Sequence, residues 1–111
     1  MNWRVAVEPV DQPEALALVG ELDAHLAPLY PAESRHGLDL AALRMPHVRF
    51  ALARDESGAA QACGAVAFLA GIAELKRMYV RPASCGKGAA EALVRHLESV
   101  AAQQGYGMVY L

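Results

Sequence analysis

The residues best suited to chemistry form one glycine-rich segment, Gly86 to Gly88. An apolar stretch typical of a strand precedes this segment, and an amphipathic helix is expected directly after it. Because glycine has no Cβ, backbone N–H groups in such a loop can turn toward a ligand. The first turn of a helix adds a partial positive charge that favours an anion. The segment therefore predicts a site for a ligand that carries phosphate.

Two widespread phosphate-binding motifs do not fit the same residues. A P-loop requires Gly-x-x-x-x-Gly-Lys followed by Ser or Thr, and the chain contains no such run. A dinucleotide-binding fingerprint requires Gly-x-Gly-x-x-Gly, and Glu91 occupies the position of its third glycine. The spacing argues against both kinds of nucleotide site, and preferential binding of ATP or NAD would be needed to revive them.

The spacing of the cysteines and histidines gives little indication of thiol or metal chemistry. Cys63 and Cys85 lack CxxC spacing, so neither a zinc site nor a disulfide framework is indicated. Cys85 stands near the expected helix start, a position that can activate a thiol, but no histidine partner is identifiable by spacing. Cys63 lies in a strand of small residues and is interpreted as a core residue. The histidines lack metal-ligand spacing, so no metal site is expected.

Composition limits the remaining classes of function. The 111 residues form at most one domain, 1–111, and a hydrophobic content of 55% is enough for a packed core. Lys plus Arg is 10 against 12 for Asp plus Glu, and this balance excludes a strongly basic nucleic-acid binder. No apolar stretch approaches the roughly 18 to 20 residues of a membrane span. We expect a soluble, cytoplasmic protein without a nucleic-acid or membrane partner.

Hydrophobic periodicity supplies the elements that must position the glycine segment. Residues 48–54 alternate, with Val48, Phe50 and Leu52 on one face. A helix joins the last two expected strands, which favours their parallel pairing. The apolar stripe of that helix is expected at Ala90, Leu93, Val94, Leu97, Val100 and Ala101. The expected elements are strands at 4–8, 48–54, 61–69, 73–80 and from 107 onward, and helices at 38–44, at 88–104 and from a start at 11–14, with Asp11 as the cap, to about 29.

The segment from Glu74 to Leu111 resembles the acetyl-CoA motif of the GNAT family of N-acetyltransferases. That motif reads Gln/Arg-x-x-Gly-x-Gly/Ala after a strand with a bulky apolar triplet, and here it corresponds to Cys85 through Ala90. The order of the earlier elements also suits the family. The resemblance implies an α/β (α+β) fold, in which helices flank both faces of a mixed, mainly antiparallel sheet.

The resemblance also implies acetyl-CoA as cosubstrate and transfer of its acetyl group to an amine of a small molecule or a protein. Glu74 lies where several members keep a general base that takes the amine proton. The alternative interpretation pairs the Glu74 carboxylate with Lys76 or Arg77. Lys87 would touch a phosphate or remain solvated. The implied cofactor-binding residues are Met78, Tyr79 and Val80 beside the pantetheine, and Cys85, Gly86, Lys87, Gly88, Ala89 and Ala90 at the pyrophosphate.

Two departures from the family pattern carry further expectations. Cys85 replaces the Gln or Arg of the motif, so weaker cofactor binding is expected. The helix and two strands that follow in the family are missing after Leu111, which would leave an exposed sheet edge. A homodimer is therefore expected, formed by strand pairing near Met108 to Leu111 or by exchange of elements. The alternative is a truncated, catalytically weak or inactive CoA-binding or dimerising module, which turnover with amines would distinguish. Residues 33–36 are either part of the acceptor pocket or a solvated loop.

Overall fold

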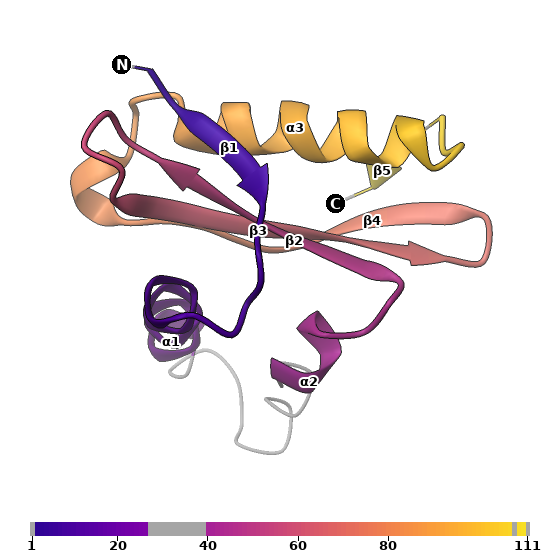
Figure 1. Cartoon of the computed structure of the whole chain (residues 1–111), viewed down its shortest axis with the longest axis horizontal. Helices are drawn as coiled ribbons and strands as arrows, with labels where there is room; N and C mark the ends of the chain where they lie inside the picture. The colour runs from indigo at the N-terminus through magenta and orange to yellow at the C-terminus, as the bar shows by residue number, and fades with distance from the viewer. Residues whose placement is uncertain (1, 27–39, 108, 111) are drawn as a thin grey trace.

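The fold is a five-stranded sheet with helices on both faces. The computed structural model describes residues 2–26, 40–107 and 109–110. The strand order is β1-β2-β3-β4-β5; the first four strands pair antiparallel and β5 pairs parallel with β4, as expected (Figure 1). The elements are β1 (Arg4–Val7), α1 (Pro13–Leu26), α2 (Leu40–Leu43), β2 (Val48–Arg54), β3 (Ala60–Leu69), β4 (Ile72–Val80), α3 (Ala89–Gln103) and β5 (Val109–Tyr110).

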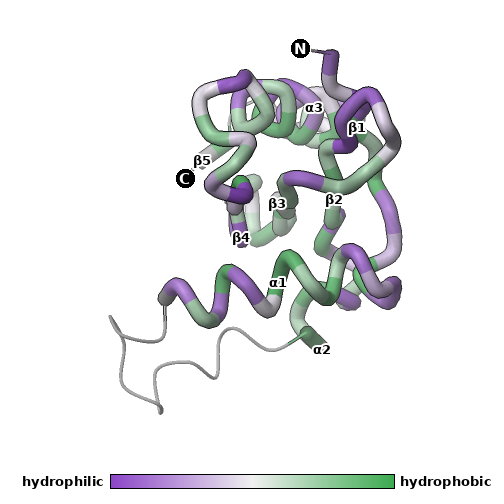
Figure 2. Tube along the Cα trace, turned by 90° about the vertical axis from the view of Figure 1, so that its left-hand side faces the viewer, coloured by the Kyte–Doolittle hydropathy of each residue, from purple (hydrophilic) through white to green (hydrophobic). Residues whose placement is uncertain are grey.

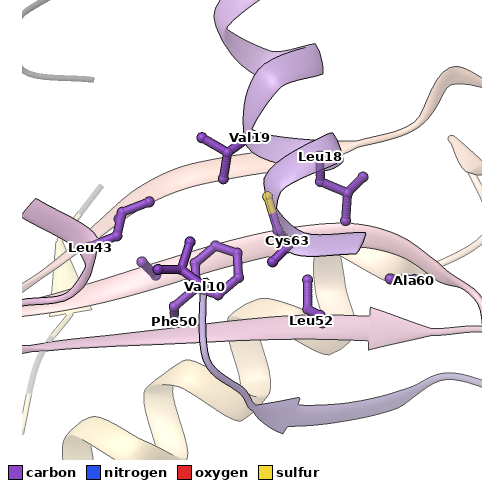
Figure 3. Close-up of a cluster of buried hydrophobic side chains, with 10 residues drawn as sticks. Val10, Leu18, Val19, Leu43, Phe50, Leu52, Ala60 and Cys63 are labelled. Atoms are coloured by element: carbon purple, nitrogen blue, oxygen red, sulfur yellow. The ribbon is translucent and has the colours of Figure 1, made fainter. Parts of the chain in front are cut away.

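The sheet separates two hydrophobic cores. Helices α1 and α2 cover one face and α3 covers the other, which Figure 2 shows with the strands between them. The first core gathers Phe50 and Leu52 of β2 beneath Leu18 and Val19 of α1 (Figure 3). The second places α3 on the opposite face of the same strands. The alternation predicted for β2 is therefore confirmed, because its even-numbered residues face α1 and its alanines face α3.

The expected elements agree with the structure where the structure describes them. Residues 27–29, at the expected end of the first helix, and the segment 33–36 lie outside the described residues. One detail of the predicted helix stripe is wrong: Ala90 is exposed, and Ala89 is buried in its place. The helix begins with Ala89 turned toward the sheet, which leaves Ala90 at the surface beside the glycine loop. Among the described residues, no helix is long and apolar enough to cross a membrane.

Truncating Leu93 tests the packing of α3 on the sheet. Leu93 is fully buried in the second core, so Leu93→Ala is expected to lower the free energy of unfolding by about 2–5 kcal/mol through lost burial and a residual cavity. Leu16 of α1 is 40% exposed, and Leu16→Ala is expected to cost less than about 1 kcal/mol. Urea unfolding of both variants measures the difference. Equal losses would contradict the assignment of Leu93 to the core.

Candidate functional site

A β-bulge in β4 shapes the site. Cys63 pairs with Tyr79 and Ala65 pairs with Lys76, so β4 carries one extra residue between these pairs. Arg77, within this stretch, has a φ of +61° and is the only non-glycine residue with positive φ in the described part of the chain. A bulge of this kind re-aims the side chains that follow it and occurs often beside active sites.

The bulge changes which side chains face each helix. Before it, Ala73 and Leu75 face α3; after it, Met78 and Val80 do so. Lys76 and Arg77 therefore lie on the same side of the sheet although they are neighbours in sequence. On β3, Gly64 leaves the space that the Met78 sulfur occupies, since a Cβ there would clash with it.

The outer edge of β4 opens beyond Glu74. Among the described residues, β5 pairs with β4 only at Ala73 with Val109 and at Glu74 with Tyr110. From Leu75 to Val80, β4 therefore has backbone groups on this side that no described strand covers. An extended ligand can hydrogen-bond to such an edge in the way an added strand does.

The glycine loop continues directly from this open edge. Gly86 and Gly88 have φ values of +77° and +88°, a region that residues with a Cβ rarely adopt. Gly88 is the N-cap of α3, and its carbonyl accepts a hydrogen bond from the Ala92 amide at 3.0 Å. The amides of residues 89–91 precede this first helical donor and have no acceptor within the helix. They are available to an anion.

A concavity of about 290 Å³ lies in front of these amides. It is lined by Val80 at the end of β4, by Ser84 and Cys85, and by the start of α3. Glu91 also lines the concavity and would repel an anion, but Arg95 pairs with its carboxylate at 3.1 Å. The exposed Cys85 has its Sγ 3.9 Å from the Val80 carbonyl oxygen.

Two residues that the sequence analysis did not assign hold the loop in place. The Trp3 indole donates from Nε1 to the Lys87 carbonyl at 2.8 Å, across 84 residues of chain. Ser84 is buried within the short 3₁₀ turn that precedes the loop, and its amide donates to the Arg81 carbonyl at 2.8 Å. The single tryptophan beside a short first strand was a visible signal, but its partner could not be identified from spacing alone.

The Glu74 carboxylate lies before the bulge, on the face covered by α1 and α2. Its Oε1 is 3.0 Å from Lys76 Nζ, and its side chain is 33% exposed. The ion pair with Lys76 foreseen as the alternative interpretation is therefore present. Pairing keeps the carboxylate oriented and leaves it open to solvent, so the structure is compatible with a role in proton transfer.

A row of polar side chains joins α1 to the open part of β4. Arg81 donates to Glu21 at 2.8 Å, which lowers the pKa of that carboxyl below its usual range. Tyr79 donates from its hydroxyl to the same carboxylate at 3.2 Å, and burial is the main cause that raises its pKa. Arg77 Nη1 lies 3.7 Å from Asp23 Oδ1, and burial lowers the pKa of its guanidinium. These contacts fix Arg77 and Tyr79 of β4, and Arg81 directly after it, on the α1 face.

Neither cysteine forms a disulfide. Burial raises the pKa of the Cys63 thiol to about 12, so this thiol stays protonated and unreactive, in agreement with its predicted place in the core. No cluster of three or more potential metal-ligating His, Cys, Asp or Glu side chains occurs in the portion of the chain that is described.

Comparison with known proteins places this geometry in context. The model of the acetyltransferase (GNAT) family matches residues 18–111. A protein of Azospirillum brasilense named IAA acetyltransferase is 39% identical over 112 residues, which make up 99% of this chain and 72% of the relative.

Solved structures share the fold at lower identity. Ribosomal-protein-alanine N-acetyltransferase from Brucella melitensis biovar Abortus 2308 superposes with a TM-score of 0.80 at 19% identity, covering 100% of this chain and 79% of that chain. PaiA N-acetyltransferase from Thermoplasma acidophilum, solved in complex with coenzyme A, gives 0.69 at 16% identity, covering 96% and 76%. At these identities the likeness shows a common fold.

Proposed function

The chain belongs to the acetyltransferase (GNAT) family, and from that premise we propose that it binds acetyl-CoA along the open edge of β4 and at the start of α3. It is an acetyl-CoA-dependent N-acetyltransferase, and acetyl-CoA, its cosubstrate, supplies the activated acetyl group as a thioester. The observation that supports this location is that the open strand edge runs directly into the glycine loop. A strand edge from Leu75 to Val80, which no described strand covers, leads through one short turn into two glycines with positive φ and a helix N-terminus.

The residues present fit a pyrophosphate. Apart from Gly86 and its two chain neighbours, no described residue has an atom within 4 Å of the position that a Cβ would take there, so the loop leaves room for a bulky anion. The amides of Gly86 to Ala90 would donate to its oxygens, and the exposed Lys87 adds a positive charge nearby. Cys85 contributes neither the charge of an Arg nor the amide donor of a Gln at this position of the family motif, so backbone donors carry this contact. The backbone groups of Met78, Tyr79 and Val80 would bond the pantetheine.

Glu74 is proposed as the general base. An alkylamine has a pKa of about 10 and arrives protonated at neutral pH, so it must lose a proton before it can attack. Glu74 takes that proton, while Lys76 holds the carboxylate in position. The neutral amine nitrogen then bonds to the thioester carbon, the carbon–sulfur bond breaks to release the CoA thiolate, and the nitrogen gives up a second proton to solvent as the amide forms. The thiolate takes a proton from solvent, and the products are an N-acetyl amine and CoA.

Release of CoA thiol in the presence of amines tests this function. We expect acetyl-CoA to bind with a micromolar Kd, about −8 kcal/mol, and thiol to appear only when an amine is added. Mass spectrometry of the amine should show one added acetyl group. Binding of acetyl-CoA without turnover on any amine would instead indicate a CoA-binding module and would contradict the proposed chemistry.

Removing the tryptophan hydrogen bond should weaken cofactor binding without unfolding the chain. Trp3→Phe keeps most of the apolar ring but loses the donor to the Lys87 carbonyl, a bond worth about 1 kcal/mol. We expect the Kd of acetyl-CoA, measured by calorimetry, to rise about five-fold. Tyr106→Phe is the matched control, since Tyr106 stacks on Phe68 outside the proposed cofactor site, and it should leave the Kd unchanged. If Trp3→Phe and Tyr106→Phe bound acetyl-CoA with the same Kd, this result would contradict the anchoring role of Trp3.

The assembly and location of the protein are also part of the proposal. β1 forms one edge of the sheet and Val7 on it is 45% exposed, which supports a homodimer that covers this edge. The contact expected near Met108 to Leu111 includes two residues outside the described ranges. Sedimentation at high micromolar concentration should detect a dimer, and a monomer there would contradict it. The free thiols of Cys63 and Cys85 support a reducing, cytoplasmic compartment.

A further inference from the structure

A second cavity, of about 160 Å³, lies on the opposite side of β4 from α3. Leu43 and Met45, from the end of α2 and the turn after it, form one wall, and Val48 and Ala67 belong to β2 and β3. Lys76 and Arg77 close it on the β4 side. The two consecutive β4 residues share this cavity because the bulge turns both toward the same face.

The cavity adjoins the proposed base. Ala67 is the cross-strand partner of Glu74, and directly opposed residues of antiparallel strands have Cβ atoms roughly 5 Å apart on one face. Glu74 and Lys76 share that face, as their 3.0 Å ion pair requires. A nitrogen held beside Glu74 would therefore carry its substituent over Ala67 and into the cavity.

The walls favour an apolar, uncharged substituent. Leu43, Val48 and Ala67 offer hydrocarbon, while the charges of Lys76 and Arg77 already face Glu74 at 3.0 Å and Asp23 at 3.7 Å. His47 is the remaining polar residue among the described residues that line the cavity. Met45 is 48% exposed at the cavity, so a ligand would cover apolar surface that now contacts water. The volume is close to that of an engineered apolar cavity of about 150 Å³ that binds benzene.

We infer that the acceptor is a primary amine that carries an apolar group about the size of a phenyl ring, and that this cavity holds the group. The inference rests on the proposed function, since it requires the reacting amine beside Glu74.

Paired amines test the selectivity. Phenethylamine and ethylamine have the same reacting group, and 1,4-diaminobutane adds a charge in place of the ring. We expect kcat/KM for phenethylamine to exceed that for each of the other two by about 100-fold, because one methylene in an apolar pocket is already worth about ten-fold or more. Equal values for the three amines would overturn the inference while leaving the acetyltransferase function intact. Absence of turnover with every amine, despite acetyl-CoA binding, would overturn both.

Variants locate the selectivity in this cavity. Met45→Ser removes exposed hydrocarbon and is expected to lower kcat/KM for phenethylamine about ten-fold with no change for ethylamine. Leu16→Ser is the matched control, because Leu16 is 40% exposed on α1 and does not line the cavity. Ala67→Leu fills the cavity floor and should abolish the preference. If the filled variant fails to fold, Met45→Ser decides: an unchanged phenethylamine-to-ethylamine ratio overturns the assignment.

Discussion

Replacing Gly88 with valine is expected to weaken acetyl-CoA binding at least about 100-fold. At a φ of +88°, a β-branched residue is strained by roughly 1–2 kcal/mol, and relief of that strain turns the loop amides away from the ligand. A lost hydrogen bond to a charged phosphate costs about 1.5–3 kcal/mol more. Together these reach about 3 kcal/mol, which corresponds to about two orders of magnitude in Kd. Calorimetric titration with acetyl-CoA measures the change.

Gly105 supplies a matched control for backbone strain. It follows α3 and has a φ of +90°, and no described residue other than its chain neighbours comes within 4 Å of the position of a Cβ, so Gly105→Val introduces a similar local strain at the other end of the helix. Both variants should lose about 1–2 kcal/mol of unfolding free energy. Only Gly88→Val should lose acetyl-CoA affinity. Comparable affinity losses in the two variants would show that strain, and not loop geometry, controls binding.

Replacing Glu74 with glutamine is expected to lower kcat by about 10²- to 10⁴-fold, the usual contribution of a positioned general base. The side chain keeps its shape, so the Kd of acetyl-CoA should stay within two-fold of the original, roughly the noise of such measurements. Without the base, reaction depends on amine that is already neutral. Activity of Glu74→Gln should therefore rise about ten-fold per pH unit up to the amine pKa near 10.

The exposed Glu98 on α3 provides the control for loss of one carboxylate. Glu98→Gln should retain full kcat, because this residue lies away from both cavities. If Glu74→Gln keeps full activity at neutral pH, the carboxylate serves only its ion pair with Lys76. In that case Lys76→Met and Glu74→Gln should lower the free energy of unfolding by similar amounts and leave kcat unchanged.

Regular elements could be predicted because one physical signal dominates each of them. The alternation in residues 48–54 specifies which face of β2 enters each core, since a shift of one residue would reverse every side chain. The helix after the glycines combines a periodic apolar stripe with Gly105 just past its end. Even there, Ala89 and Ala90 could not be distinguished, because both are alanines and only the phase of the first turn separates them.

The bulge could not be predicted from local sequence. Arginine at position 77 gives no sign of positive φ, which glycine or asparagine would have given. Strict alternation from Leu75 would have turned Arg77 toward α3, whereas the extra residue turns it to the α1 face beside Lys76. The second cavity, which is proposed to hold the acceptor's apolar group, depends on that one-residue change and on α2, which is distant from β4 in sequence. The glycine loop could therefore be identified from the sequence, and the second cavity could not.

The central claim is that acetyl-CoA binds at the glycine loop and the adjoining edge of β4. Amide ¹H–¹⁵N chemical shifts of the labelled chain, followed during titration with acetyl-CoA, test it residue by residue. The account predicts that the largest shifts occur at Gly86, Gly88, Ala89 and Ala90, with smaller ones at Met78 to Val80, while Gly105 and Gly58 remain unchanged. Saturable shifts confined to other parts of the sheet, or none at millimolar acetyl-CoA, would contradict it.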